Sequence, residues 1–254
     1  IKWRGHRPNN WIGASINEPI SSVVQTTGLN YIGQFKWSSP ISDRLLAEAS
    51  VFTLPVNYNL SFQPDAAPDA IATFDQIRSV FSGVSPRQDI NTARMWTYAG
   101  FVSYVTGAHN VKAGMQVRRG FSQELFETRG DIVQIVSNGV PNSVRLVNNP
   151  SGHKEEGVNT GIYVQDSWTF GRVTLNPGVR YERFVMSIPA QSAGAGRWVP
   201  AREFPAQENI VNWNTLSPRF GMSWDLFGDG RTAVKGGLSR YDRLAGITIV
   251  LFFC

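Results

Sequence analysis

Seven charged residues lie on the polar parity of segments in which apolar and polar residues alternate, an arrangement that predicts a charged wall. Arg219, for example, stands between Pro218 and Phe220, and successive side chains of an extended strand point to opposite faces. Such a wall would attract an anionic ligand or dock another domain. Salt bridges within the wall, to Glu182 and Asp225, are the interpretation that we favour. The candidates for lumen-facing charged residues are Lys112, Arg118, Arg180, Glu182, Arg219, Asp225 and Lys235.

The other residues that could do chemistry predict no catalytic, metal or cofactor site. His6, His109 and His153 are far apart and lack the spacing of metal ligands, so we expect solvated turn histidines. Glu155 and Glu156 would point to opposite sides of any strand, and we expect them in an exposed loop. Serine, histidine and aspartate occur without a local motif such as the nucleophile elbow. We therefore expect a protein that is not an enzyme.

The composition excludes several classes of protein. The 254 residues carry a net charge of +5, with 42% hydrophobic and 12% aromatic residues. The charge is scattered, without the basic runs and interleaved aromatics that suit nucleic acid, so we expect no nucleic-acid partner. No run approaches the roughly 18 apolar residues of a membrane helix, which leaves strand spans of ~10 residues open. The single cysteine, Cys254, permits no intrachain disulfide.

Alternation of apolar and polar residues predicts eight main strands. In residues 216–226, Leu216, Phe220 and Met222 share one parity, and Arg219 lies on the other. We expect Phe220 and Met222, with Met115 and Val179 on other strands, to face an apolar medium. No helical period competes over a comparable length. The predicted strands are 31–37, 44–54, 92–105, 111–119, 158–170, 173–187, 216–226 and 232–241.

Short and long connections alternate between these strands. Four connections are short, and three long ones cover residues 55–91, 120–157 and 188–213. Tight turns at one end and long loops at the other are typical of outer-membrane barrels, whereas soluble sandwiches mix loop lengths at both ends. We predict an all-β fold: a partial, antiparallel, up-and-down transmembrane β-barrel of about eight membrane strands. Residues 1–254 would form part of one β-barrel domain, with 1–29 as an irregular lead-in.

Local signals also predict a hairpin and two strand registers. Asn-Gly is a strong hairpin signal, so residues 131–136 and 143–147 should pair around 137–141 as an extracellular hairpin. If apolar faces coincide, Val105 pairs with Val111 and Phe101 opposes Met115, which puts residues 93, 95, 99, 101 and 105 on the apolar face. In the pair 158–187, a two-residue turn would put Asp166 on the apolar face. A three-residue turn would put Gln165 there.

Five segments resemble the barrel region of TonB-dependent outer-membrane receptors, within them the Oar-like group. The first contains Tyr104-Val105-Thr106-Gly107 and runs over 102–114, and the second is Asn138-Gly139-Val140-Pro141. The others are 163–168 (YVQDSW), 175–182 (LNPGVRYE) and 216–230 (LSPRFGMSWDLFGDG). Their order and spacing cover about 92–241, whereas the first 90 residues match by pattern alone.

The resemblance implies a bacterial outer-membrane location and a barrel of about 22 strands closed by an N-terminal plug. Because we predict eight strands and find no plug-like segment, we interpret the chain as an internal fragment. The implied function is binding and import of a scarce small ligand with energy from a TonB-type inner-membrane complex. The plug, that complex and outer-membrane lipid are the implied partners. An outer-membrane structural or adhesive barrel without transport is the alternative, and a soluble carbohydrate-binding β domain is the third hypothesis.

Overall fold

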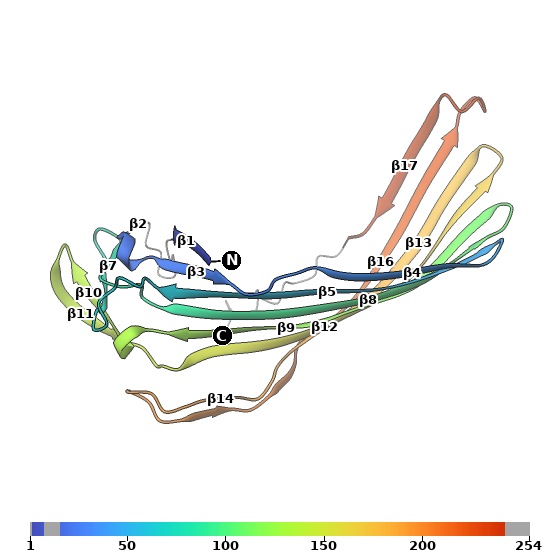
Figure 1. Ribbon diagram of the computed structural model, residues 1–254. Coiled ribbons are helices and arrows are strands. Elements are labelled where there is room, and N and C mark those ends of the chain that lie inside the picture. Colours follow the sequence, from blue (N-terminus) through green and yellow to red (C-terminus); the bar gives the residue numbers. More distant parts are fainter. Residues whose placement is uncertain (1, 8–15, 242–254) are drawn as a thin grey trace.

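The main sheet is a long antiparallel meander, which confirms the all-β prediction. The computed structural model describes residues 2–7 and 16–241, and in these the main sheet has ten strands. Eight form the meander, in which each strand pairs with the next along the chain (Figure 1). They are β4 (Gly33–Ser42), β5 (Leu45–Phe62), β8 (Gln88–Val105), β9 (His109–Glu127), β12 (Ser151–Phe170), β13 (Val173–Ile188), β16 (Gln207–Asp225) and β17 (Ala233–Ser239). Within the described residues, no helix has the length and apolar character needed to cross a membrane.

The tight turns gather at one end of this sheet, and the long connections lie at the other. The turns β4–β5, β8–β9, β12–β13 and β16–β17 share one end in Figure 1, where β7, β10 and β11 mark the opposite end. Several strands are longer than the sequence pattern indicated, and β12 alone has 20 residues. A strand needs only ~10 residues to cross a bilayer. Strands of this length exceed what a bilayer crossing requires, and the excess lies on the side of the long loops if the tight turns mark the other membrane surface.

The register between β8 and β9 differs from the predicted one by a single residue. Tyr104 pairs with Val111 and Gly100 with Met115, because Thr106 and His109 exchange backbone hydrogen bonds of 2.8 and 3.1 Å and tighten the turn. A slip of one residue moves every side chain of a strand to the other face. Phe101 therefore lies on the polar face of the sheet, and the prediction for residues 93, 95, 99, 101 and 105 is wrong. The apolar face of β8 carries Trp96, Tyr98, Val102 and Tyr104 instead.

The register between β12 and β13, which the sequence left open, follows a two-residue turn. Phe170 pairs with Val173, and Gly171 takes a φ of 56°, a left-handed conformation that glycine adopts without steric cost. This pairing puts Asp166 on the same face as Ile162 and Val164. The meander thus carries a carboxylate on its apolar face.

The N-terminal stretch is more regular than the expected lead-in of residues 1–29. Strand β3 (Val23–Thr27) pairs with the far half of β5, whereas β4 pairs with the near half, and β1 (Lys2–Arg7) pairs with β3. At the junction, Gly28 N donates to Asn57 O over 3.1 Å, and Asn57 N donates to Asn30 Oδ1 over 2.6 Å. β3 and β4 are two parts of one interrupted strand, which lacks the continuous alternation that would have revealed it.

A second, smaller sheet stands at the long-loop end and holds a compact apolar core. It contains β2 (Ile16–Asn17), β6 (Ala72–Asp75), β7 (Val80–Ser82), β10 (Ile132–Ser137) and β11 (Val140–Leu146). The core residues are Ala66, Ala72, Phe81, Val84, Val133 and Ile135. The predicted hairpin is confirmed as β10–β11, although its turn has two residues, Asn138 and Gly139, rather than five. Their φ angles of 50° and 83° are those of a type I′ turn. The expected loop 55–91 contributes two strands to this sheet.

Asp75 fastens the two hairpins of the small sheet together. Its carboxylate accepts backbone N–H groups from Ile77, Arg78, Asn138 and Gly139 over 3.0–3.1 Å. Burial opposes ionisation of Asp75, but the four donors outweigh it and lower its pKa. The short strands β14 (Gln191–Ala193) and β15 (Arg202–Phe204) form a separate hairpin in the loop between β13 and β16.

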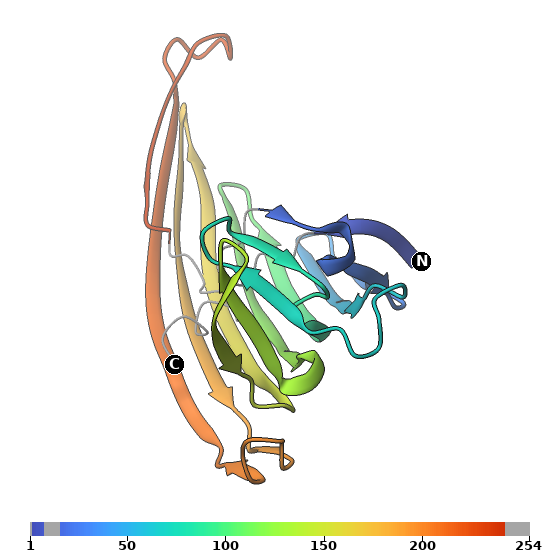
Figure 2. The same cartoon turned by 90° about the vertical axis from the view of Figure 1, so that its left-hand side faces the viewer.

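The main sheet is open and curved. Seen along another direction, it bends from the blue N-terminal strands at one edge to the red β17 at the other (Figure 2). In the described part of the chain, β4 and β17 do not pair with each other. The described residues therefore form an arc of barrel wall rather than a closed barrel.

We expect cysteines at Gly107 and Asn142 to report opposite sides of the membrane in the full-length protein. Both positions have room, since a Cβ at Gly107 meets nothing within 4 Å and Asn142 is exposed. In intact cells, a membrane-impermeant maleimide should label N142C and spare G107C. Both should react once the outer membrane is permeabilised. Equal labelling in intact cells would contradict this topology.

Candidate functional site

The strand registers sort the side chains of the meander into an apolar face and a polar face. The row Val102, Ala113, Val164, Val179 and Pro218 crosses five neighbouring strands on the apolar face. Met115, Val179, Phe220 and Met222, predicted to share this face, all lie on it by register. Large apolar side chains are exposed along it, among them Phe35, Trp37, Trp96, Tyr98, Tyr104, Met115, Ile162, Trp168, Phe170, Tyr181, Leu216, Phe220, Met222 and Trp224.

The apolar face has the height of a membrane span in the central strands. Counting from the tight turns, the first basic residue on this face of β13 is Arg183, and the first on β9 is Arg119. Each lies about ten residues beyond its turn, which is the length of a membrane-crossing strand. Above and below lie aromatic residues, Trp96 and Tyr98 near these arginines, and Trp168 and Trp224 near the turns. Aromatic girdles of this kind flank the apolar band of outer-membrane barrels.

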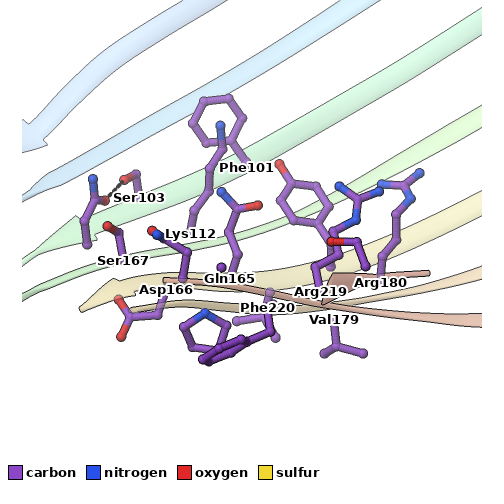
Figure 3. A pocket seen from close by; sticks show the side chains of 18 of the residues that line it. Phe101, Ser103, Lys112, Gln165, Asp166, Ser167, Val179, Arg180, Arg219 and Phe220 are labelled. Carbon is purple, nitrogen blue, oxygen red and sulfur yellow. Dashed lines mark hydrogen bonds between the residues drawn. The ribbon is translucent and has the colours of Figure 1, made fainter. Parts of the chain in front are cut away.

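The seven predicted charged residues share the opposite, polar face by register, as their alternation indicated. Several of them line a hollow of about 860 Å³ on this face together with Tyr163, Gln165 and Asn176. In Figure 3, Lys112, Gln165 and Arg180 rise from one side of the strands. Val179 points away from the other side. We call the face that carries this hollow the polar wall.

Arg180 is the centre of the polar wall and is paired. Its Nη2 donates to Glu182 Oε1 over 2.8 Å and to Gln116 Oε1 over 3.4 Å. The guanidinium lies over Gly161 on the neighbouring strand, where a Cβ would collide with it. Tyr163 lies in the same way over Gly114, since a Cβ there would come within 2.7 Å of the phenol oxygen. Glycines of the wall thus make room for long side chains that lie flat on the sheet.

Lys112 and Glu48 extend the wall toward β4. The Nζ of Lys112 lies 3.5 Å from the centre of the Phe101 ring, a cation–π distance. Glu48 pairs with Lys36 over 2.8 Å and accepts a hydrogen bond from Ser38. Lys112 is therefore in contact with Phe101, the aromatic residue that was predicted to lie on the opposite, apolar face.

The remaining four candidates are not brought into one cluster, and three of them, Arg118, Arg219 and Lys235, are exposed. Arg219 lines the hollow and lies over the Tyr241 ring at 5.0 Å, and Lys235 lies opposite Ser223. Arg118 is exposed farther from the turns. Asp225 accepts turn N–H groups from Gly228 and Gly230 over 2.9 and 3.0 Å. Of the expected salt bridges, the one between Arg180 and Glu182 is present. Asp225 instead stabilises a turn.

A histidine–aspartate pair on the apolar face was missed by the sequence analysis. His109 Nδ1 lies 2.6 Å from Asp166 Oδ2, and the His109 ring stacks on Trp168 at 5.3 Å and 11°. The pair gives Asp166 a partner near the tight turns, so the carboxylate is tolerated at the edge of the apolar face. His109 is partly exposed at the first residue of β9, next to the turn as expected, but it is paired, and the register of β9 with β12 brings it to Asp166.

A second cluster lies on the polar wall beyond the height of the apolar band. Glu155 is buried in β12, not in an exposed loop, and only Glu156 points to the opposite, open side. Burial, and then the Glu124 charge, raise the pKa of Glu155 to about 7. Burial also lowers the pKa of His153, whose Nε2 lies 3.6 Å from Glu155 Oε2. Arg87 pairs with Asp89 over 2.9 Å in the same cluster. Among the described residues, no group of three or more His, Cys, Asp or Glu side chains could hold a metal ion.

The sequence matches the family described as "Outer membrane beta barrel domain" over residues 21–250. The chain belongs to this family, and its location is the bacterial outer membrane. No curated protein matches the sequence. Among solved structures, it is similar to the ferric citrate transporter FecA in its unliganded form, with 11% identity and a TM-score of 0.40. That similarity covers 78% of this chain and 25% of the FecA chain, so the chain spans about a quarter of that structure's length.

The family identifies the apolar face as the lipid-facing surface, and we expect arginine at Phe220 to test this. F220R should destabilise the full-length protein by about 2–4 kcal/mol, as cations near the bilayer midplane do. G221R, its neighbour on the polar wall, should cost less, because the nearest contact of an added Cβ is Asn176 Cβ at 3.6 Å. Urea titrations of folding into lipid vesicles measure both effects. A greater loss for G221R would show that the faces are reversed.

The raised pKa of Glu155 predicts a pH dependence of stability. The folded protein holds a proton on Glu155 up to a pH of about 7, whereas the unfolded chain releases it near 4.5. The contribution of Glu155 is thus most favourable below pH 4.5 and is lost as pH rises through about 7.

The variant E155Q should remove this pH dependence. It should gain stability relative to wild type, by roughly 1–3 kcal/mol, as pH rises through that interval. His153 alone would make stability rise with pH, opposite to Glu155, and it is present in both proteins. The difference in unfolding free energy between E155Q and wild type therefore isolates Glu155. E156Q is the matched control, since Glu156 is half exposed and pairs with Lys154 over 2.8 Å. Thermal unfolding across pH measures all three, and a wild-type curve that parallels that of E155Q would contradict the assignment.

Proposed function

We propose that this chain is part of the barrel of a TonB-dependent receptor, which binds a scarce small ligand and imports it with energy from an inner-membrane complex. The observation that carries the proposal is the polar wall. Long side chains such as Lys112, Arg180 and Arg219 alternate along it with glycines and leave a hollow of about 860 Å³. A small barrel fills its interior with side chains, whereas a wide barrel keeps a wet lumen or holds a plug.

The arrangement of charges supports the proposal that the polar wall contacts a ligand or a plug inside the barrel. Arg180 and Lys36 are paired with Glu182 and Glu48, which holds their side chains in place. Lys112 and Arg219 instead lie over the Phe101 and Tyr241 rings, and both residues line the hollow. We propose that an anionic ligand or an acidic surface of a plug contacts these two cations. The seven candidate residues would all face the lumen of the receptor.

An uptake assay on the full-length protein tests the proposal. Cells that express it should accumulate at least one compound from a labelled set of iron chelates, cobalamin, oligosaccharides and peptides. Accumulation should stop when the inner-membrane energising complex is deleted, while binding to the cell surface remains. K112Q and R219Q together should reduce binding or uptake severalfold, and K36Q should change it less. Surface binding without energised accumulation of any compound would favour a structural or adhesive barrel.

A further inference from the structure

Basic residues gather on the lipid-facing surface directly beyond the apolar band. On the four central strands β8, β9, β12 and β13, this face carries Arg183, Arg119, Arg94 and Lys154 in successive rows away from the tight turns. At the turn end, the same face of these strands carries no Lys or Arg within the described residues. The positive charge is therefore confined to the side of the long loops, where the outer leaflet of the membrane lies.

Lys154 and Arg94 each have a side-chain partner, whereas the other two cations have none among the described residues. Lys154 pairs with Glu156 over 2.8 Å, and Arg94 Nη1 donates to Asn57 Oδ1 over 2.9 Å. Arg119 and Arg183 are exposed, and within the part of the chain that the structure describes they make no ion pair. A guanidinium at the edge of an apolar surface is stabilised when a phosphate or carboxylate supplies the missing charge and hydrogen-bond acceptors.

The positions of Arg119 and Arg183 suit the binding of a single lipid headgroup between them. Arg119 lies beside Val158 on β12, and Arg183 lies beside Thr160 on the other side of the same strand. Two strand spacings across the sheet and two residues along β12 separate the backbones of the arginines by about 12 Å, which two long side chains can span. Trp96 pairs with Arg119 in the register, and Tyr98 lies one row nearer the turns. These aromatic rings mark the level of the membrane interface, where headgroups lie.

We propose that Arg119 and Arg183 form a binding site for the phosphate of an anionic outer-leaflet lipid. The acyl chains of that lipid would lie along the apolar face below, against Met115, Ile162 and Tyr181. Arg94 and Lys154 add to the positive potential above the site. The site lies on the outside of the barrel and does not depend on whether the protein transports a ligand.

The test uses the full-length protein in detergent and lipid A as the probe, before and after removal of its phosphates. Native mass spectrometry should show phosphorylated lipid A on the wild type and roughly thirtyfold less on the R119Q/R183Q variant, given about 1 kcal/mol for each arginine. Dephosphorylated lipid A should bind the wild type as weakly as lipid A binds the variant. Binding should also fall at high salt.

R118Q is the matched control, because Arg118 adjoins Arg119 but points to the polar wall. It should retain lipid A like the wild type, and a mobility shift on heating should show that every variant is folded. If the double variant does not fold, each single variant should still lose about fivefold. Equal retention of lipid A by wild type and the arginine variants, or equal binding of dephosphorylated lipid A, would overturn the proposal. So would a loss with R118Q as large as that with the double variant.

Discussion

The structure depends on one constraint, that every backbone N–H and C=O group inside a bilayer must bond to a neighbouring strand. The pairing of β12 with β9 meets it without interruption from Ser151 to Trp168. Such a ladder also assigns each side chain to a face, because the faces alternate with every residue. The lipid-facing row that contains Val164 and the polar row that contains Gln165 are therefore set by the same hydrogen bonds. A slip of one residue would place Lys112 in lipid.

The polar wall shows how this sheet holds large polar groups without a packed layer above them. Arg180 lies over Gly161, and Tyr163 lies over Gly114, so each long side chain covers a backbone that has no side chain of its own. An alanine at Gly161 would collide with the Arg180 guanidinium and displace it from the sheet, whereas an alanine at Gly114 would collide with Tyr163 and also with Gly100 O and Phe101 Cβ on β8. The glycines therefore keep the hollow open, and the ion pair of Arg180 with Glu182 fixes the orientation of the guanidinium.

The sequence predicted the eight meander strands and most of their faces because alternation is strong where one side meets lipid. It failed for β8, where both parities are apolar: Phe101 and Met95 alternate with Val102 and Trp96, and only the turn at Thr106 decides between them. It also failed for the small sheet, whose strands β6 and β7 are too short for a period to show. The His109–Asp166 pair was out of reach because it joins residues 57 positions apart through the pairing of β9 with β12, for which the sequence offered no register.

Both faces change character at the same height, which locates the end of the membrane on the structure itself. On the outer face of β13, the apolar row ends at Arg183. On the inner face, the next residue, Phe184, is buried against Trp213, and Met186 is fully buried two residues farther on. Below this height the interior is polar and hollow, as a lumen within a bilayer requires. Above it the inner face is packed: Phe184 and Met186 are buried on β13, and the charged residues Glu155 and Asp89 are buried on neighbouring strands. A separate apolar core around Phe81 and Val133 lies at the same end of the sheet. Arg183 and Phe184 are neighbours on one strand and face opposite sides of the sheet. A shift of the strand would therefore move the end of the apolar outer row and the start of the buried inner row together.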